Sequence, residues 1–551
     1  MQKKQGKINL QLPLLSEITP FWAYRWNLTE QISYPYTGKL CIATQKNITQ
    51  HQKTALLCNN IRIQWFGDCG QHRSILAVVI AIKTITETAF PENFCYELTV
   101  TAEINLLSAC VETENYVNKN YQQIIQEVLR KHKIHVCDFQ SLQKNYPRLA
   151  YCVRYFENGL NFIHRLLATA GIHYTFKHTA QKSLMVLHDT EDSYKQLITP
   201  IPVYLAASKP KDLFGLGLWN WQSYINQRDD NAICPVFTNY ILATDVQTVA
   251  QQAIKHPNFQ QSNYYFETNA LMIEPGVSLT IKQHPKSLIQ SVYWVNKVTT
   301  HIIDYCAVPH FKQAQPAVFY LSVESVPEHD HSIPSPTYVQ PKALGIDRAT
   351  VVDFQQQTIN VNALNQIKVQ FEWDNTSKNN FDRSCWITVK QPWAGKNHGA
   401  RFIPRIGQEV IVNYENGDPE KPIIFGTCFN SKNLPPFKPE DYPYRSGYQS
   451  RSQDEIDLKN GNCLLFDDDP TKPTLQLNAQ KDLVIAIEGN KQTNITGMYE
   501  QKINNGDFIQ VAGDSLELSS MQSIQLTNGA SQIYIDKKNI VIESPSIIFK
   551  S

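Results

Sequence analysis

The stretch IEGNKQTNITGMYEQKINNGDFIQVAG, residues 487–513, decides how the C-terminal part of this chain folds. An apolar residue is followed two positions later by glycine or asparagine, and the pair recurs every eight residues without slippage. Because glycine and then asparagine tolerate positive φ best, the repeat predicts short strands separated by corners. The repeat positions are Ile487, Gly489, Ile495, Gly497, Ile503, Asn505, Val511 and Gly513.

Further apolar pairs continue on both sides of these octads, with a looser spacing. One unit of eight residues buries very little apolar surface, and its strand edges lack partners. A single-chain solenoid, whose turns are usually near 20 residues, and a terminal β-sandwich are the alternatives. Octads favour identical chains wound around one axis, with the apolar residues inside. The flanking pairs are Leu475/Leu477, Leu483/Ile485, Leu516/Leu518, Ile524/Leu526, Ile533/Ile535, Ile540/Ile542 and Ile547/Phe549.

Length and composition limit the remaining possibilities. The chain has 551 residues, which predicts two to four domains, and 42% of them are hydrophobic, which excludes a wholly disordered chain. Aromatic residues make up 11%, a proportion that favours β-rich domains. Lys and Arg number 51 against 50 Asp and Glu, so no net field attracts nucleic acid or anionic lipid.

Neither a membrane span nor a secretory leader is expected. The basic segment Met1–Lys7 is not followed by a continuous apolar run, and the longest such run, Ile75–Ile82, is too short to cross a bilayer. The twelve cysteines never form a Cys-x-x-Cys pair, so we interpret most of them as reduced, buried apolar residues. We therefore expect the protein to be cytoplasmic when it is made.

The N-terminal part reads as strand-rich with two helices. Helical spacing of apolar residues predicts helices over Tyr121–Arg130 and Leu160–Ala170, the second of which ends at Gly171. Alternation then predicts a strand over 172–176. Two more segments are compatible with strands: Thr99–Leu106 and Leu184–Leu187.

A compact strand-rich block follows a Pro- and Ser-containing linker at His331–Pro336. Ile367, Val369 and Phe371 alternate, and similar short runs are separated by turn residues, which is typical of a small five-stranded barrel of the OB type. A second Pro-rich linker ends the block. The predicted domains are a base domain at 1–344, an OB-fold neck at 345–430, a linker at 431–444 and a needle at 445–551.

Four segments of this block closely resemble the VgrG spike proteins of type VI secretion systems. In that family they form the OB domain shared with contractile-tail phage hubs. The segments are Ile367–Asp374, Ser384–Gly395, Phe402–Val412 and Gly417–Ile423, and their motif residues are Trp373, Trp386, Trp393, Pro404, Arg405, Gly407, Asp418 and Pro419.

The resemblance extends over nearly the whole chain. Leu28–Tyr36 is similar to the family's opening signature, and a helix-then-strand signature is carried by Tyr155, Phe162, Arg165, Leu166, Gly171, Ile172, Tyr174, Phe176 and His178. The chain departs from the family at Asn365–Gln366, where relatives usually carry Gly-Arg, and at Glu372, where His is frequent.

The resemblance implies a mainly β architecture: a hub of β-barrel-like subdomains with a few helices, an OB neck and an intertwined triple-stranded β-helix. It implies a homotrimer seated on a hexameric tube protein (Hcp in that family), with baseplate proteins and effector proteins as further partners. A PAAR-type cap would cover the tip near Ile547 and Phe549. Such a spike is injected through the type VI apparatus and penetrates a target membrane mechanically.

Several sharper hypotheses are less favoured. Only the short 431–444 linker lies where phage relatives carry a lysozyme, and no catalytic motif is recognised, so we expect no enzyme; an unrecognised hydrolase site and a phage tail hub remain alternatives. Eight Lys/Arg face seven Asp/Glu between 361 and 430, which disfavours nucleic-acid binding. Two candidate metal clusters, His132/His135/Cys137 and Glu328–His331, look like a helix end and a loop. We therefore expect no catalytic, cofactor-binding or metal site.

Overall fold

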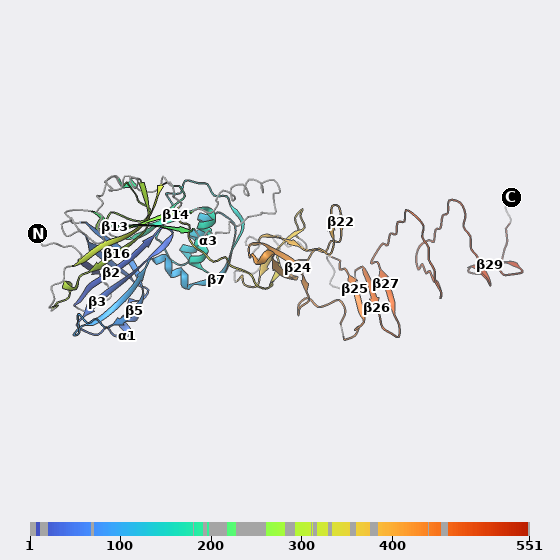
Figure 1. The fold of residues 1–551 in the computed structure, drawn as a ribbon. Coiled ribbons are helices and arrows are strands. Elements are labelled where there is room, and N and C mark those ends of the chain that lie inside the picture. The colour runs from blue at the N-terminus through green and yellow to red at the C-terminus, as the bar shows by residue number, and fades with distance from the viewer. Residues whose placement is uncertain are drawn as a thin grey trace. The chain divides into compact units, whose positions relative to one another are not determined.

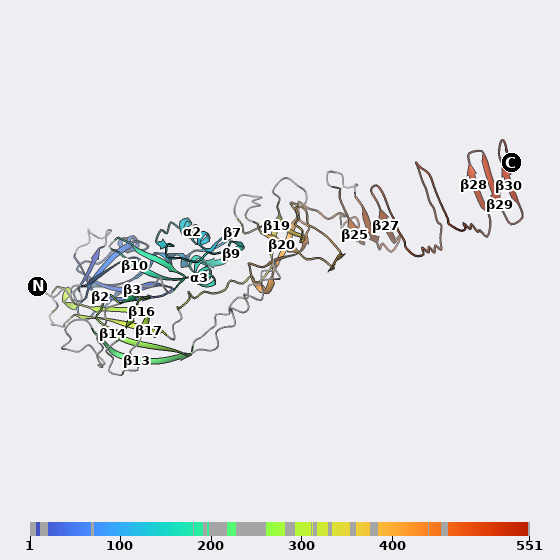
Figure 2. The same cartoon turned by 90° about the horizontal axis from the view of Figure 1, so that it is seen from above.

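The fold is taken from a computed structural model of the whole chain. It describes residues 7–11, 20–67, 71–179, 181–190, 196–197, 217–227, 260–280, 292–309, 311, 317–328, 333–352, 360–374, 384–438, 440–452 and 461–548. Strands dominate, so the prediction of a mainly β chain is confirmed (Figures 1 and 2). The chain divides into two compact units, Met1–Pro443 and Tyr444–Ser551.

The base domain, which precedes the barrel and is called the hub from here on, is built on one large sheet whose strands lie between Ile8 and Pro327. Alternating buried and exposed side chains make each long strand two-faced, and the buried faces enclose Trp26 and Trp65, both fully buried. Two short strands extend this sheet: β15 (Ser278–Thr280) pairs with β16 (Val292–Ile303), and β12 (Gln196–Leu197) pairs with β15. The main strands, in spatial order, are β1 (Ile8–Gln11), β4 (Asn60–Phe66), β5 (His72–Ile85), β6 (Phe94–Thr101), β3 (Tyr34–Thr44), β2 (Phe21–Gln31), β16 (Val292–Ile303), β17 (Val318–Pro327), β14 (Gln260–Thr268) and β13 (Leu218–Gln227).

Both predicted helices are confirmed, as α2 (Tyr121–Lys131) and α3 (Gly159–Ala170). Asn158 caps α3 by accepting a hydrogen bond from the Asn161 N–H, and Gly171 ends it with φ of 67°. A third helix, α1 (Gln50–Leu56), was not predicted.

Two smaller sheets flank α3. One pairs β7 (Val111–Lys119) with β9 (Leu149–Asn158); the other contains β10 (His173–His178), β11 (Ser183–His188) and β8 (Cys137–Asp138). The strand predictions over 172–176 and 184–187 are thereby confirmed. A short 3-10 turn, η6 (Tyr305–Ala307), follows β16.

The strand predicted over Thr99–Leu106 is wrong in its second half. Strand β6 ends at Thr101, and residues 103–109 form the 3-10 helix η3 (Glu103–Ala109). Ile104 and Leu107 are both buried, three residues apart. That spacing places both side chains on one face of a 3-10 helix, and the gain from burying them outweighed the strand pattern.

A closed five-stranded barrel follows, as predicted. Its core is formed by alternate residues of each strand, such as Ile367, Val369 and Phe371. Asn365, at the position where the resemblance leads us to expect glycine, has φ of 57° and thus adopts the left-handed turn that glycine usually supplies. The strands, in barrel order, are β18 (Asp347–Val351), β19 (Gln366–Phe371), β20 (Trp386–Val389), β24 (Pro422–Cys428) and β23 (Glu409–Tyr414), with a hairpin of β21 (Ala394–Gly395) and β22 (His398–Gly399) and the turn η9 (Glu415–Gly417).

The C-terminal unit has two small antiparallel sheets. The first contains β25 (Arg445–Gln449), β26 (Cys463–Asp467) and β27 (Thr474–Asn478); the second contains β28 (Ile524–Asn528), β29 (Ser531–Ile535) and β30 (Ile540–Glu543). Between β27 and β28 the described stretch 479–523 contains no strand, and Figure 2 draws it as a bare trace.

Candidate functional site

The octad repeat occupies the strandless stretch 479–523, where nearly every residue is exposed. Ile487 and Ile495 each keep 48% of their surface exposed, and Val511 keeps 88%. Apolar side chains at regular spacing with no partner in their own chain are a hallmark of an interface between chains. The repeat is therefore the candidate functional surface of the C-terminal unit, and its inward register remains a prediction.

The corners of the repeat lie where the sequence placed them, but their backbone differs from expectation. The chain bends at Glu488–Gly489 and again near Gly497, Asn505 and Gly513. None of these glycines, nor Asn505, has a left-handed φ; the left-handed residue is Gly506, with φ of 128°. The prediction of positive φ at the repeat positions is thus wrong, because these bends form with ordinary φ values.

Those glycines are also uncrowded within the chain. A Cβ built at Gly489, Gly497 or Gly513 meets no atom within 4 Å. Neither φ nor crowding within one chain explains a glycine at these positions. A close approach by a strand of another chain would give a physical reason for so small a residue.

The predicted tip follows the last sheet, whose final strand ends at Glu543. Ile547 lines a shallow apolar hollow together with Leu526, Ile533 and Ile542. Ile547 and Ile548 are 49% and 75% exposed. Phe549 lies outside the described residues. The described part of the predicted tip is therefore open and apolar.

The barrel motif residue Trp373 packs on the barrel core. Its ring stacks on Phe371 at 4.7 Å between centroids, and its Nε1–H donates to Asp347 Oδ2 at 3.1 Å. The same carboxylate oxygen accepts hydrogen bonds from the hydroxyls of Tyr155 and Tyr414. Since Tyr155 belongs to β9 of the hub, Asp347 joins the hub to the barrel.

The other two motif tryptophans face outward. Trp386 is 38% exposed and lies 5.4 Å from Lys368 Nζ, while Trp393, 62% exposed, meets the His398 ring edge-on. A cation over a ring face is a stabilising arrangement in its own right. On Trp386 that cation occupies a face on which a nucleic-acid base would stack.

The remaining motif residues build two turns. Gly407 has φ of 80°, and its N–H donates to Val351 O at 2.9 Å, while the Arg405 N–H donates to the Gln408 side chain. Pro404 and Pro419 are buried.

In the second turn Asp418 Oδ1 accepts from the Glu420 N–H at 3.0 Å. Burial raises the pKa of Asp418 above its usual value. These residues position the backbone and do not converge on a pocket.

A buried ion triad lies in the hub. Arg73 donates to both carboxylate oxygens of Glu30, at 2.9 and 3.0 Å, and His178 Nε2 lies 3.0 Å from the same carboxylate. Burial alone would raise the pKa of Glu30, but Arg73 and His178 lower it to about 2. The Glu30 carboxylate therefore links β2 to β5 and β10. Because it is buried and fully paired, it is poorly placed to exchange protons with a substrate.

Metal ligation gains no support from the part of the chain that is described. Across the described residues, no three or more His, Cys, Asp or Glu side chains gather in a way that could hold an ion. His132 Nε2 lies 3.6 Å from Glu112, and Glu328–His331 falls mostly outside the described residues. Within the same residues, no helix is long and apolar enough to cross a membrane.

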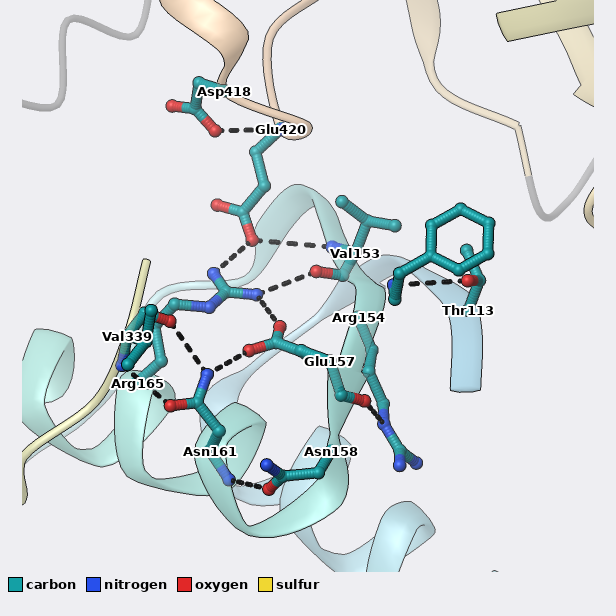
Figure 3. Close-up of polar contacts among 11 residues, drawn as sticks. Thr113, Val153, Arg154, Glu157, Asn158, Asn161, Arg165, Val339, Asp418 and Glu420 are labelled. Atoms are coloured by element: carbon teal, nitrogen blue, oxygen red, sulfur yellow. Dashed lines mark hydrogen bonds and ion pairs between the residues drawn. The ribbon is translucent and has the colours of Figure 1, made fainter. Parts of the chain in front are cut away.

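Sequence reasoning missed the contact between α3 and the barrel. Arg165 of α3 donates to Glu420 Oε1 of the barrel at 2.8 Å (Figure 3). Both residues stood inside recognised segments, but nothing in a linear sequence pairs an arginine with a glutamate so many residues away. Only the folded arrangement reveals the pair.

Two family models match the chain. One, described as phage tail baseplate hub (GPD), covers residues 29–212; the other, described as type VI secretion system/phage-baseplate injector OB domain, covers residues 348–429. The first lies within the hub and the second coincides with the closed barrel.

Three curated relatives align with most of this chain. The type VI secretion system spike protein VgrG1b of Pseudomonas aeruginosa is 26% identical over 437 aligned positions, covering 73% of this chain and 58% of its own length. VgrG3 of Vibrio cholerae is 26% identical over 469 positions, covering 78% and 45%. The actin cross-linking toxin VgrG1 of Vibrio cholerae is 25% identical, covering 73% and 39%. This chain spans about half the length of these relatives.

Solved structures share the fold. A component of the Escherichia coli type VI secretion system, described as similar to the T4 bacteriophage tail proteins gp27 and gp5, gives a TM-score of 0.53 at 16% identity and covers 77% of this chain and all of its own. A chain of a lidless PdpA–VgrG complex gives a TM-score of 0.51 at 9% identity and covers 94% of this chain and 93% of its own.

Proposed function

Because this chain belongs to the VgrG family of spike proteins, we propose that it is the trimeric tip of a type VI secretion machine. Three copies wind their C-terminal segments into a needle, and sheath contraction drives that needle through a target envelope. The hub seats on a hexameric tube protein, and baseplate proteins surround it. The protein waits in the cytoplasm and leaves the cell through the apparatus itself.

One observation carries this proposal: the exposed octads at 487–513. A lone chain that exposes an isoleucine or valine at every eighth residue loses the hydrophobic stabilisation of each of them. Three copies around one axis bury these residues against one another and pair the free strand edges. The glycines with no neighbour in their own chain then give a partner strand room to approach.

The needle's outer face and tip fit the same role. From Arg445 onward the chain carries ten Lys/Arg against fourteen Asp/Glu, so a trimer presents an acidic exterior that favours solubility. The apolar hollow near Ile547 suits a cap protein of the PAAR type, which would shield it from water. Effector proteins are the cargo of such a tip.

We propose a mechanical and not a catalytic role for this chain. One relative is an actin cross-linking toxin, and this chain covers only 39% of that protein. An unrecognised hydrolase activity is the alternative, and assays of peptidoglycan and phospholipid hydrolysis on the pure protein separate the two. A phage tail hub is a second candidate, favoured by the hub match at 29–212; neighbouring genes for sheath and cap, or for a capsid, decide between them.

The proposal is tested by the native mass of the full chain in solution. We expect three chains per particle, because burying the octads requires partners. A stable monomer at micromolar concentration contradicts the needle. A dimer contradicts it equally, because two chains leave the third side of each octad exposed.

A further inference from the structure

The hub and the barrel meet at a polar junction whose centre is Arg165. This arginine lies on α3 and keeps only 5% of its side chain exposed. Through Nη2 it donates to Val153 O and to Glu157 Oε1, both at 2.7 Å, and through Nη1 it donates to Glu420 Oε1 of the barrel (Figure 3). One side chain therefore binds its own domain and the next one at the same time.

The barrel presents Glu420 from a turn that is built to aim it. Asn416 and Gly417 both have left-handed φ, 54° and 74°, which reverses the chain sharply. Asp418 then accepts from the Glu420 N–H and fixes the residue that follows Pro419. The Gly417–Glu420 segment thus places the Glu420 carboxylate against Arg165 of α3.

The segment that connects hub and barrel, residues 333–344, is fastened to the same helix. His173 Nδ1 lies 3.1 Å from Pro334 O, and His164 Nδ1 lies 3.1 Å from Thr337 O. Asn161 exchanges two hydrogen bonds with the backbone of Val339, at 2.7 and 2.8 Å. We call this segment the strap, because side chains of α3 and β10 hold it along its length.

The strap ends on the barrel turn. The Ala343 N–H donates to Gly417 O at 2.9 Å, one turn away from Glu420. Glu157, which Arg165 binds, also accepts from Asn161, which binds the strap. Arg165, Glu157, Asn161, the strap and Glu420 therefore form one continuous network.

We infer that Arg165 is a positioning residue that locks the OB barrel onto the hub, so that the two domains move as one body. Buried charges resist separation strongly, since removing either partner leaves the other desolvated and unpaired. The lock itself is independent of the needle; only its value for transmitting thrust to a spike rests on the proposed function. If the barrel rotated freely on the hub, part of the force of contraction would be lost in that rotation. A barrel fixed to the hub transmits the force.

Hydrogen–deuterium exchange on the purified full-length protein tests the lock. Glu420→Gln keeps the size of the side chain, removes the barrel's charge and leaves the Arg165–Glu157 pair in place. We expect roughly tenfold faster exchange of the Val339 and Ala343 amides, with the barrel strands β19 and β23 unchanged. Glu415→Gln, in the same turn, is the matched control and should leave exchange at wild-type rates.

A second variant keeps the test decisive if the first folds poorly. Arg165→Lys retains the positive charge but loses the planar fork that reaches Val153, Glu157 and Glu420 together, so its strap should exchange at an intermediate rate. Strap exchange that is fastest in Glu420→Gln, intermediate in Arg165→Lys and unchanged in Glu415→Gln, with the native mass unchanged, supports a lock that depends on the geometry of the Arg165 side chain. If the strap amides of both variants exchange at the rate of Glu415→Gln, the lock is wrong, even where the protein still forms trimers. If the protein does not form trimers but the strap amides exchange in the expected order, the spike proposal is contradicted and the lock is not.

Discussion

Apolar side chains are mostly buried in the hub but mostly exposed in the needle segment, residues 445–551. Trp26 and Trp65 of the hub are fully buried within their own chain, whereas Ile495 and Val511 of the needle segment are 48% and 88% exposed. Both regions follow a clear sequence pattern, alternation in the one and an octad in the other. A periodic apolar pattern therefore indicates which residues form a face, but it does not say whether their own chain buries that face.

The largest expected effect is on the needle alone. Ile495→Asp places a charge where three chains would converge in the proposed needle, and burying unpaired carboxylates would cost more than the assembly can recover. We expect loss of trimers by native mass, while the thermal unfolding of the hub and barrel stays as in the wild type. Gln492→Asp, at a polar position of the same unit, is the control and should still assemble. Normal trimers of Ile495→Asp would show that the inward register is wrong.

Acid should affect the hub and spare the needle. Burial lowers the pKa of His164 and of His188 to about 4, whereas an unfolded histidine titrates near 6.5. Below pH 6.5 the unfolded state therefore takes up protons that the folded state refuses, so the hub's free energy of unfolding falls as the pH drops toward 4. All fifteen histidines precede Arg445, so the needle lacks this response.

Denaturant unfolding at pH 7 and at pH 4.5 measures that effect. Each buried imidazole should contribute on the order of 3 kcal/mol of lost stability over the full window. His164→Gln removes one of the buried histidines whose pKa is lowered and should make the hub's stability depend less steeply on pH. Glu30 interferes little, because its own loss of stability begins only near the unfolded pKa of 4.5 and continues as the pH falls toward its folded pKa of about 2. A pH-independent hub would contradict the buried, neutral histidines.

The smallest expected effect distinguishes glycines in the two regions. Gly171 ends α3 with φ of 67°, and a Cβ there meets nothing within 4 Å, so Gly171→Ala should cost only the backbone strain of about 1 kcal/mol. Gly497→Ala should leave the unfolding of the hub unchanged, since the φ of Gly497 is ordinary and no atom of its own chain lies within 4 Å of the added Cβ. It should weaken the trimer, because in the proposed needle a strand of another chain would occupy that space. Calorimetry of both variants, with native mass for the second, measures the contrast. An assembled Gly497→Ala trimer of wild-type stability would mean that no strand approaches there.

Local features could be predicted from the sequence because local forces decide them. Helix α3 ends at Gly171, and the five barrel strands follow from alternation and turn residues. Asn365 in a left-handed turn is consistent with the family's glycine at that place. Where two local patterns competed, as at Ile104 and Leu107, the burial of both side chains prevailed over the strand.

Contacts between distant segments could not be predicted in the same way. The pairing of Arg165 with Glu420 depends on how β9, α3 and the barrel turn are arranged in space. The convergence of Tyr155, Trp373 and Tyr414 on Asp347 is equally invisible in one sequence without an alignment. The site residues of the needle and its tip stay predictions, since the partners proposed for them would lie on other chains.

The order of strands in the hub has a consequence for folding kinetics. Strand β2, near the start of the chain, lies between β3 and β16, and Gln31 pairs with Lys297. A ribosome must therefore synthesise most of the hub before this edge of β2 can be covered, and contacts so far apart in sequence form slowly. Until β16 arrives, the early strands expose a hydrogen-bonding edge that invites aggregation. Cells that express this protein should need chaperone capacity during synthesis, well before any question of assembly arises.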